Sequence, residues 1–510
     1  MSWLDRVERL GNRLPDPATL FALGALGVMA LSQLAADLGW SVEKTLLRDG
    51  RPVQETVRAV GLLGPDGLYW ALSNLVKHFM DFPPLGVVLV GMLGIGVAER
   101  GGLIGALLRG ALLAVPPVLL TPTVVFLGVM SSLGLDAGYV VLPPVAAALY
   151  QAVGRSPLVG LAAVFAGVSG GFGANLLITS LDPMLAELST ASAHLVDPDY
   201  AVAATANWWF MIASTLLLTA VGWAVTATWV EPRMAGKPAA EGGPGGAASD
   251  PERRLQPAER RGLALAAAAA ALGLLVLAAA VWLPGAPLSG MDGVFPRWVR
   301  AIVPLLFLGF LIPGAVYGVA VGRIRSDRDL ATMMGETMAA MGPYLVLAFF
   351  AAQFIAWFAH SGLGEMLAVT GGRLLARAAL PHALLVLGFV VVVMLVNLVI
   401  GSMSAKYAFL APVFVPMFMQ VGISPELTQA AYRVGDSVTN VITPLNPYVV
   451  ILLVFVQRHA PRAGIGTLLA LMLPYALAFA CAWSGLLALW IAAGAELGPA
   501  GPLAYLPQAP

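Results

Sequence analysis

The stretch Asp136–Leu158, DAGYVVLPPVAAALYQAVGRSPL, has a related counterpart later in the chain, Ser404–Leu427, SAKYAFLAPVFVPMFMQVGISPEL. At one fixed offset the identical residues are Ala137, Tyr139, Leu142, Pro144, Val145, Val153, Gly154, Ser156 and Pro157, which meet Ala405, Tyr407, Leu410, Pro412, Val413, Val421, Gly422, Ser424 and Pro425. A chance match between two apolar runs would not keep proline, glycine, serine and tyrosine in register. We therefore infer that the chain consists of two related halves.

A second shared motif follows the first in both halves. Ile178–Pro183 reads ITSLDP, and Ile442–Pro447 reads ITPLNP. Duplicated halves whose apolar segments are interrupted by glycine and proline at matching positions are typical of secondary transporters, which bind substrate near the middle of the bilayer. The repeat thus predicts an all-α polytopic membrane protein with broken helices, and we expect its second copy to be inverted. Because proline follows Asp182 and Asn446, we also expect a helix to end at each of them.

The composition places the chain in a membrane. Of its 510 residues, 59% are hydrophobic and only 11% are charged, whereas about a quarter of the residues of a soluble domain are charged. Lys and Arg balance Asp and Glu at 28 each, which leaves no basic excess to bind nucleic acid. The single cysteine, Cys481, excludes an internal disulfide, and no His, Glu or Cys cluster has metal-ligand spacing. Since no P-loop, nucleophile elbow or HExxH motif occurs, we expect no cofactor and no enzyme.

A basic stretch rich in glycine and proline separates the halves. We expect residues 1–230 to form the first half, 231–261 a flexible cytoplasmic linker, and 262–510 the second half. The polar residues 37–66 are predicted to form a loop. The tail after Arg462 has no Lys or Arg, which favours the outer side of the membrane and an odd number of spans.

A polar stripe crosses an apolar stretch of the second half. Gln429, Arg433, Asp436 and Asn440 follow one another at steps of four, three and four, which places them on one helix face. Ionisable residues inside a membrane are costly and mark functional sites by default. We interpret Arg433 as the residue that receives a substrate carboxylate, and Asp436 as a residue that holds a cation or pairs with Arg433. The alternative is a plain Arg433–Asp436 ion pair that locks two helices together.

The segment Gly401–Tyr407 follows an apolar run that contains Asn397. Its small residues predict an unwound tip whose hydroxyl groups, including that of Ser404, face substrate or cation. Tyr407 would offer a ring for stacking. The alternative is an ordinary turn with Lys406 snorkelling to the membrane interface.

Three residues of a glycine-rich run, Gly170, Gly171 and Asn175, are candidates for a supporting role. Small residues let a helix open or two backbones approach, but they serve plain helix packing equally well. Asp182 and its counterpart Asn446 are further candidates, because both end the repeated ITxL motif. The alternative for Asp182 is a carboxylate in a solvent-facing loop.

These motifs resemble those of the AbgT family, the p-aminobenzoyl-glutamate transporters, and the resemblance covers nearly the whole chain. The stretches that carry it are Val7–Pro15, Ser169–Pro183, Gly401–Lys406 and Tyr432–Pro447. The resemblance implies a bacterial inner-membrane homodimer, with about nine spans and two re-entrant hairpins in each subunit. It also implies handling of p-aminobenzoyl-glutamate and export of sulfonamide antimetabolites.

The resemblance also implies roles for individual residues. Those of the implied substrate pathway are Asp182, Ser404, Pro425, Arg433 and Asp436. The implied cation position is Asn397 with Asp436. Where family members often carry Trp after Ser-Ala-Lys, this chain has Tyr407, a smaller ring for stacking on an aryl group.

We therefore expect a secondary transporter of aromatic amides in the lipid bilayer, driven by a gradient of Na⁺ or protons. Its substrate would be a small aromatic anion. Three other hypotheses remain at this point: an importer of dicarboxylates or other organic anions with similar architecture, a passive channel, and a membrane-embedded amidohydrolase. A substrate panel, the gradient dependence of transport and an assay for free p-aminobenzoate would separate them.

Overall fold

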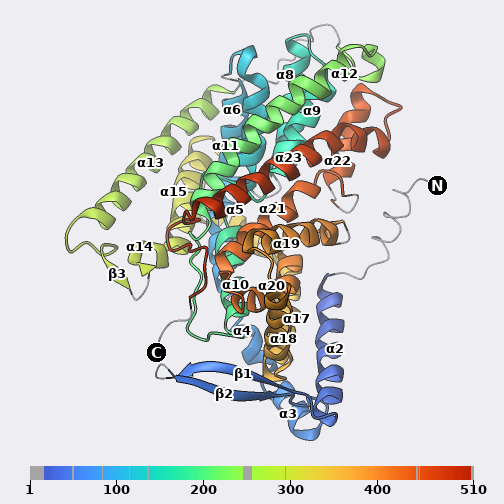
Figure 1. Ribbon diagram of the computed structural model, residues 1–510. Helices are drawn as coiled ribbons and strands as arrows, with labels where there is room; N and C mark the ends of the chain where they lie inside the picture. The colour runs from blue at the N-terminus through green and yellow to red at the C-terminus, as the bar shows by residue number, and fades with distance from the viewer. Residues whose placement is uncertain are drawn as a thin grey trace.

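The described part of the chain is mostly helical (Figure 1). The computed structural model describes residues 17–48, 51–82, 84–113, 115–134, 137–244, 255–292, 295–398, 400–443, 446 and 448–506. Asp136 and the two prolines of the second ITPLNP motif, Pro444 and Pro447, lie outside these ranges.

Eleven α-helices are described up to residue 244. They are α2 (Pro17–Asp37), α3 (Pro65–Ser73), α4 (Leu75–Met80), α5 (Pro84–Arg100), α6 (Leu103–Leu113), α7 (Leu120–Met130), α8 (Ala137–Ala152), α9 (Pro157–Phe165), α10 (Leu181–Ala193), α11 (Trp208–Val225) and α12 (Glu231–Ala235). Two π-helical turns extend α9 and α11, namely η3 (Ala166–Gly170) and η4 (Thr226–Val230). Single 3₁₀ turns are η1 (Pro117–Leu119), η2 (Ser131–Gly134) and η5 (Ala239–Glu241).

Eleven further helices are described in the second half. They are α13 (Pro257–Trp282), α14 (Arg297–Arg300), α15 (Ile302–Ala320), α16 (Asp327–Ala340), α17 (Gly342–His360), α18 (Leu363–Ala378), α19 (His382–Asn397), α20 (Met403–Met419), α21 (Pro425–Thr439), α22 (Tyr448–His459) and α23 (Ile465–Ala493). Helices α10, α20 and α21 lie centrally, with α13 and α15 on one flank (Figure 1).

The predicted multi-pass helical fold with broken helices is confirmed. Six described helices are long and apolar enough to cross a membrane: Ala18–Asp37, Trp208–Ala235, Pro257–Trp282, Ile302–Ala320, Gly342–His360 and Gly466–Ala493. A pair bent by 60°, Pro84–Arg100 with Leu103–Ala111, adds a seventh candidate. The shorter apolar helices include α8, α19 and α20, so the repeated regions are built from segments that are too short or too bent to be simple spans.

The repeated sequence folds in the same way in both halves. Ser156 and Ser424 precede the first residues of α9 and α21, where Pro157 and Pro425 occupy the first helical turn. Proline suits this place because its missing N–H would find no partner in the first turn. The repeated glycines, Gly154 and Gly422, adopt φ of +74° and +81°, which a residue with a Cβ rarely tolerates.

The predicted loop at residues 37–66 is wrong in its central part, which forms a β-hairpin. Strands β1 (Ser41–Arg48) and β2 (Arg51–Arg58) pair antiparallel from Ser41↔Arg58 to Arg48↔Arg51. The sequence VQETV on β2 contains three β-branched residues, which favour strands, but the charged residues of this region obscure that preference. A second, much shorter pair joins β3 (Met291–Asp292) and β4 (Phe295–Pro296). The described part of the chain is thus helical with two small pairs of strands.

Both ends of the predicted linker, 231–261, contain helix. Helix α12 begins at Glu231, whose carboxylate lies 2.5 Å from Arg155 Nε. Helix α13 begins at Pro257, and its Glu259 lies 2.7 Å from Arg109 Nη2. Ion pairs therefore tie both ends of this stretch to the first half.

Close backbone packing around η3 gives a stability prediction. A Cβ on Gly167 would lie 2.3 Å from the carbonyl oxygen of Val125 in α7, which is too close for both backbones to stay in place. Gly167→Ala is therefore expected to lower stability by about 1–3 kcal/mol, the usual cost of overpacking. Gly273→Ala on α13 is the matched control, because nothing lies within 4 Å of its added Cβ. Thermal unfolding in detergent measures both variants, and equal midpoints would contradict the prediction.

Candidate substrate and ion site

Two unwound segments, one from each half, contact each other at the centre of the protein. The first joins η3 to α10, and the second joins α21 to α22. Gly173 N donates a hydrogen bond of 2.8 Å to Ser437 Oγ, and Asn446 Nδ2 donates one of 2.9 Å to Ser169 Oγ. Each unwound segment therefore hydrogen-bonds to the end of the helix that precedes the other segment, across the interface between the halves.

The supporting residues hold the first unwound segment in place. A Cβ on Gly170 would lie 2.8 Å from Phe479, and one on Gly171 would lie 2.5 Å from Val129, so both glycines permit close packing. Asn175 Nδ2 donates to Ser132 Oγ at 2.9 Å, while Asn175 Oδ1 accepts from a backbone N–H within its own segment. These contacts fit a structural role for all three residues.

Asp182 lies at the beginning of a helix, not at the end of one as predicted. It occupies the first turn of α10, where its carboxylate accepts hydrogen bonds from Thr179 N at 2.6 Å and Thr179 Oγ1 at 2.8 Å. Pro183 is compatible with a helix here because proline is tolerated in the first turn. Asp182 is buried, so the alternative of a solvent-facing carboxylate is also wrong.

The partner of Asp182 is Arg433 from the other half. Arg433 Nη2 lies 2.6 Å from Asp182 Oδ1, and the two side chains are 1% and 2% exposed. A second contact joins Arg433 Nη1 to Gly173 O at 3.5 Å. Arg433 Nε is buried and has no hydrogen-bond partner within the described ranges. The guanidinium thus bridges both halves and keeps one donor unsatisfied.

The predicted Arg433–Asp436 pair does not form, although both residues belong to α21. Asp436 Oδ1 lies 2.5 Å from Lys406 Nζ instead. Residues at i and i+3 share a helix face, but the long arginine side chain extends to α10 while the short aspartate faces α20. Two cross-element ion pairs therefore replace one local pair.

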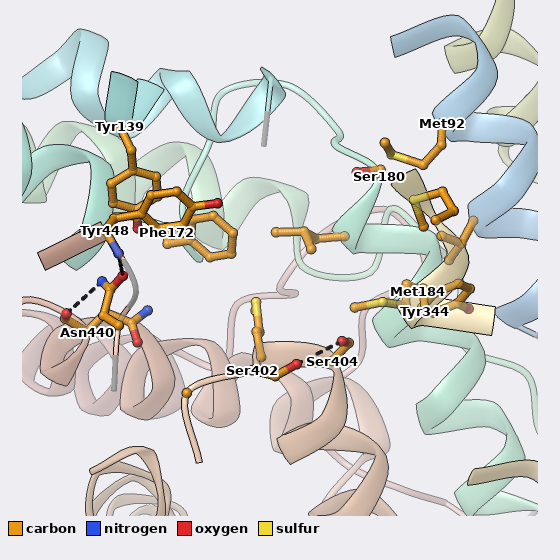
Figure 2. A pocket seen from close by; sticks show the side chains of 16 residues that line it. Met92, Tyr139, Phe172, Ser180, Met184, Tyr344, Ser402, Ser404, Asn440 and Tyr448 are labelled. Atoms are coloured by element: carbon orange, nitrogen blue, oxygen red, sulfur yellow. Dashed lines mark hydrogen bonds between the residues drawn. The ribbon is translucent and has the colours of Figure 1, made fainter. Parts of the chain in front are cut away.

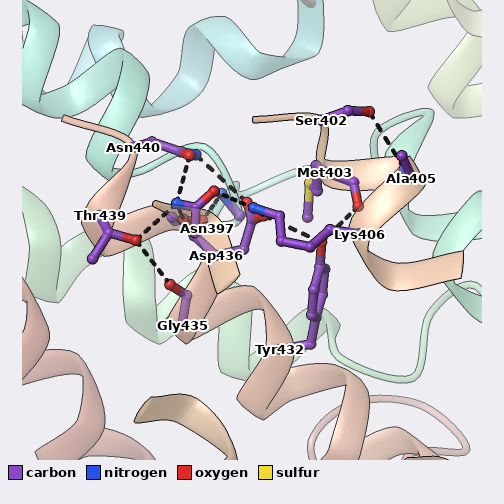
Figure 3. A network of polar contacts seen from close by, with 12 residues as sticks. Asn397, Ser402, Met403, Ala405, Lys406, Tyr432, Gly435, Asp436, Thr439 and Asn440 are labelled. Atoms are coloured by element: carbon purple, nitrogen blue, oxygen red, sulfur yellow. Dashed lines mark hydrogen bonds and ion pairs between the residues drawn. The ribbon is translucent and has the colours of Figure 1, made fainter. Parts of the chain in front are cut away.

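The predicted cation position contains the ammonium group of Lys406 (Figure 3). Lys406 Nζ also donates to Asn397 Oδ1. Asn397 Nδ2 in turn donates to Asp436 O at 2.6 Å, Thr439 Oγ1 at 2.7 Å and Asn440 Oδ1 at 2.9 Å. Lys406 is fully buried, so the snorkelling alternative is wrong.

A cavity of about 570 Å³ lies beside this centre (Figure 2). Its lining residues are Val88, Met92, Tyr139, Phe172, Ser180, Leu181, Met184, Met341, Tyr344, Gly401, Ser402, Met403, Ser404, Asn440, Asn446 and Tyr448. The predicted residues Ser404, Asn440 and Asn446 are among them. Asp182 and Arg433 do not line the cavity themselves. The lining includes Leu181, which precedes Asp182, and Phe172, which precedes the Gly173 that contacts Arg433.

Tyr407 does not face this cavity, which corrects the expected stacking role. Its ring is fully buried against Tyr432 at 4.4 Å between centroids, and its hydroxyl lies 2.6 Å from Ser189 Oγ. The repeat counterpart, Tyr139, lines the cavity and stacks on Tyr448 at 4.0 Å with an interplanar angle of 7°. Sequence reasoning missed Tyr139 and Tyr448 as site residues. The alignment of Tyr139 with Tyr407 was the signal that could have identified the first of them.

Two further residues that the sequence singled out lie outside the cavity lining. Pro425 is buried in the first turn of α21, where it begins the helix that carries Arg433 and Asp436. Gln429 accepts a hydrogen bond of 2.9 Å from Ser189, the same serine that contacts Tyr407. The residues of the polar stripe therefore share one helix face, but they contact different neighbours.

Comparison with known proteins agrees with this architecture. The model of the AbgT putative transporter family matches residues 2–505. The p-aminobenzoyl-glutamate transport protein of Escherichia coli (strain K12) is 35% identical over 500 residues, covering 97% of this chain and 95% of that protein. The crystal structure of the Alcanivorax borkumensis YdaH transporter is 46% identical with a TM-score of 0.89, covering 95% of this chain and all of YdaH. Neisseria gonorrhoeae MtrF, described within a class of antimetabolite efflux pumps, is 39% identical with a TM-score of 0.91 over 100% of both chains. The chain belongs to the AbgT family of transporters.

Proposed function

We propose that this membrane transporter carries p-aminobenzoyl-glutamate and related aromatic amides, and exports sulfonamide antimetabolites, using a gradient of Na⁺ or protons. The observation that carries the proposal is the Arg433–Asp182 pair, which lies between the two unwound segments and next to an aromatic cavity. The E. coli relative named for p-aminobenzoyl-glutamate and the description of MtrF support the substrate class.

Arg433 is suited to exchange one carboxylate for another. Asp182 occupies one edge of the guanidinium and leaves Nε without a partner in the described part of the chain. Arginine binds carboxylates in bidentate fashion when two of its N–H groups are free to face them. A glutamate carboxylate of the substrate can take the place of Asp182 once the segment around Gly173 moves aside. Breaking this pair would then loosen the contact between the halves.

The aromatic end of the substrate fits the wall formed by Tyr139, Tyr448 and Phe172 (Figure 2). The cavity volume of about 570 Å³ lies within the range of roughly 300–1,000 Å³ that small-molecule sites occupy. Ser404, Asn440 and Asn446 add hydroxyl and amide groups for the polar amide linkage. A small dicarboxylate has no aryl group to place against this wall, so the lining favours an aromatic anion.

Further parts of the proposal follow from family membership. We place the protein in the bacterial inner membrane as a homodimer whose subunits each contain a complete pathway. The contacts that join Asp182 to Arg433 and Lys406 to Asp436 form within one chain, which supports a complete pathway in each subunit.

Counterflow in proteoliposomes tests the proposal. Vesicles loaded with unlabelled p-aminobenzoyl-glutamate should accumulate the labelled compound, and an added sulfonamide should compete. The Na⁺ gradient and the pH gradient should then be varied separately. One of the two should change the rate at which the labelled compound accumulates. Accumulation of a dicarboxylate in preference, or release of free p-aminobenzoate, would contradict the proposal.

The tyrosine stack gives a prediction for affinity. Tyr448→Leu is expected to weaken binding of p-aminobenzoyl-glutamate about 3- to 10-fold, because an aromatic contact contributes about 0.5–1.5 kcal/mol beyond burial. Tyr407→Phe is the control, since this ring packs against Tyr432 away from the cavity. Equilibrium binding of the labelled ligand to purified protein measures both variants. Equal losses in the two variants would contradict the assignment of the stacking wall.

A further inference from the structure

We propose that Lys406 is a tethered cation, and that its ammonium group and the coupling Na⁺ occupy the same position in turn. The inference deepens the proposed function, because it assigns a mechanism to ion coupling at the same site. Lys406 Nζ bonds to both oxygens expected of the cation position, Asp436 Oδ1 and Asn397 Oδ1. A bound Na⁺ and this ammonium therefore exclude each other on these two oxygens.

Burial makes the exchange obligatory. The side chains of Lys406 and Asp436 are 0% and 1% exposed. A buried carboxylate that loses its counter-charge becomes strongly unfavourable, whereas two cations on one carboxylate would leave a buried excess charge. The position consequently requires one positive charge at a time. Na⁺ meets this requirement with the oxygen ligands that hard cations prefer.

The lysine is attached to the turn that faces the cavity. Helix α20 begins at Met403 with Ser402 as its cap, and Ser402, Met403 and Ser404 line the cavity. Lys406 is the fourth residue of α20 and lies in its first turn. A small rotation of this end of the helix therefore brings the ammonium group toward an anionic substrate. The hydroxyl oxygen of Tyr432 lies 2.6 Å from Met403 O and 3.2 Å from Asp436 Oδ1, which links the turn to the carboxylate. Substrate and Na⁺ would thus promote each other's binding.

Neutralising the lysine should open the position to Na⁺. Lys406→Met keeps an apolar stem of the same length as that of lysine but removes the charged ammonium group at its end. Its thermal midpoint in detergent should be low in choline chloride and rise saturably with NaCl. Wild-type protein without substrate should show no such rise, because Lys406 already supplies the cation. The double variant Lys406→Met/Asp436→Asn should be insensitive to Na⁺, since no carboxylate remains at this position.

A measurement on the wild-type protein keeps the proposal testable if Lys406→Met does not fold. Reductive methylation of Lys406, followed by mass spectrometry, should be slow in choline chloride. Na⁺ with p-aminobenzoyl-glutamate should raise its rate about tenfold, equivalent to a shift of about 1.4 kcal/mol in the exchange equilibrium.

Two results would overturn the proposal. They are a thermal response of Lys406→Met to Na⁺ equal to that of wild type, and a wild-type labelling rate unaffected by Na⁺ with ligand. The Na⁺ response of Lys406→Met needs no substrate. Failure of counterflow with p-aminobenzoyl-glutamate would therefore contradict the proposed function while leaving this response, and the inference, intact.

Discussion

Arg433→Gln is expected to abolish transport of p-aminobenzoyl-glutamate and to reduce its binding roughly 10- to 100-fold. The loss follows from removing charge-assisted hydrogen bonds that contribute about 1.5–3 kcal/mol. The same change leaves the buried carboxylate of Asp182 without its partner at 2.6 Å. Breaking one side of a buried ion pair costs about 3–5 kcal/mol, so the variant should also unfold at a lower temperature.

The double variant Asp182→Asn/Arg433→Gln separates these two effects. It removes both charges and leaves two neutral amide groups in their place, so stability should return toward that of the wild type. Transport should stay absent, because no guanidinium remains to receive the substrate carboxylate. Thermal unfolding and counterflow on the same preparations measure the two quantities. Wild-type counterflow in the double variant would contradict a role for Arg433 in substrate binding.

Asp436→Asn is expected to eliminate the dependence of transport on the ion gradient. The substitution leaves the ammonium group of Lys406 buried with only the amide oxygen of Asn397 and a neutral side chain nearby. A stability loss of about 3–5 kcal/mol should accompany it, because a buried cation is left unpaired. Proteoliposomes with imposed Na⁺ or pH gradients measure the coupling directly.

Glu426→Gln is the matched control for Asp436→Asn. Glu426 is a second buried carboxylate on α21, but it accepts hydrogen bonds from Tyr200 at 3.1 and 2.9 Å and lies at the opposite end of the helix. Glutamine can accept the same phenol proton, so gradient-dependent transport should persist. Full gradient-dependent transport by Asp436→Asn, matching that of Glu426→Gln, would show that Asp436 does not bind the coupling ion.

The sequence predicts the membrane class and the repeat well, because both depend on local composition and spacing. Apolar length identifies the spans, and the paired Ser156–Pro157 and Ser424–Pro425 motifs begin equivalent helices. The hairpin β1–β2 escapes prediction because its charged residues resemble those of a loop. The proline after Asp182 predicts a helix end there, because proline breaks a helix interior. Proline is tolerated in a first turn, however, and that is where α10 contains it.

The chemistry of the site depends on contacts that spacing cannot reveal. The step from Arg433 to Asp436 places both on one face of α21, yet their partners come from α10 and α20. Asp182 and Arg433 are 251 positions apart in sequence, so only the packing of the two halves brings them together. The same packing encloses Tyr407 and exposes its repeat counterpart Tyr139 to the cavity. Duplication therefore identifies pairs of candidate residues, and tertiary packing decides which member of each pair faces the substrate.

The most direct test of carboxylate exchange at Arg433 is competition by two ligands that differ only in charge. Unlabelled p-aminobenzoyl-glutamate and its uncharged diamide would each compete with labelled p-aminobenzoyl-glutamate for binding to the wild-type protein. Our account predicts that the dicarboxylate competes at least about tenfold more strongly, as expected from the loss of about 1.4 kcal/mol or more of charge-assisted hydrogen bonding. Equal competition by the diamide would contradict the exchange of Asp182 for a substrate carboxylate on Arg433.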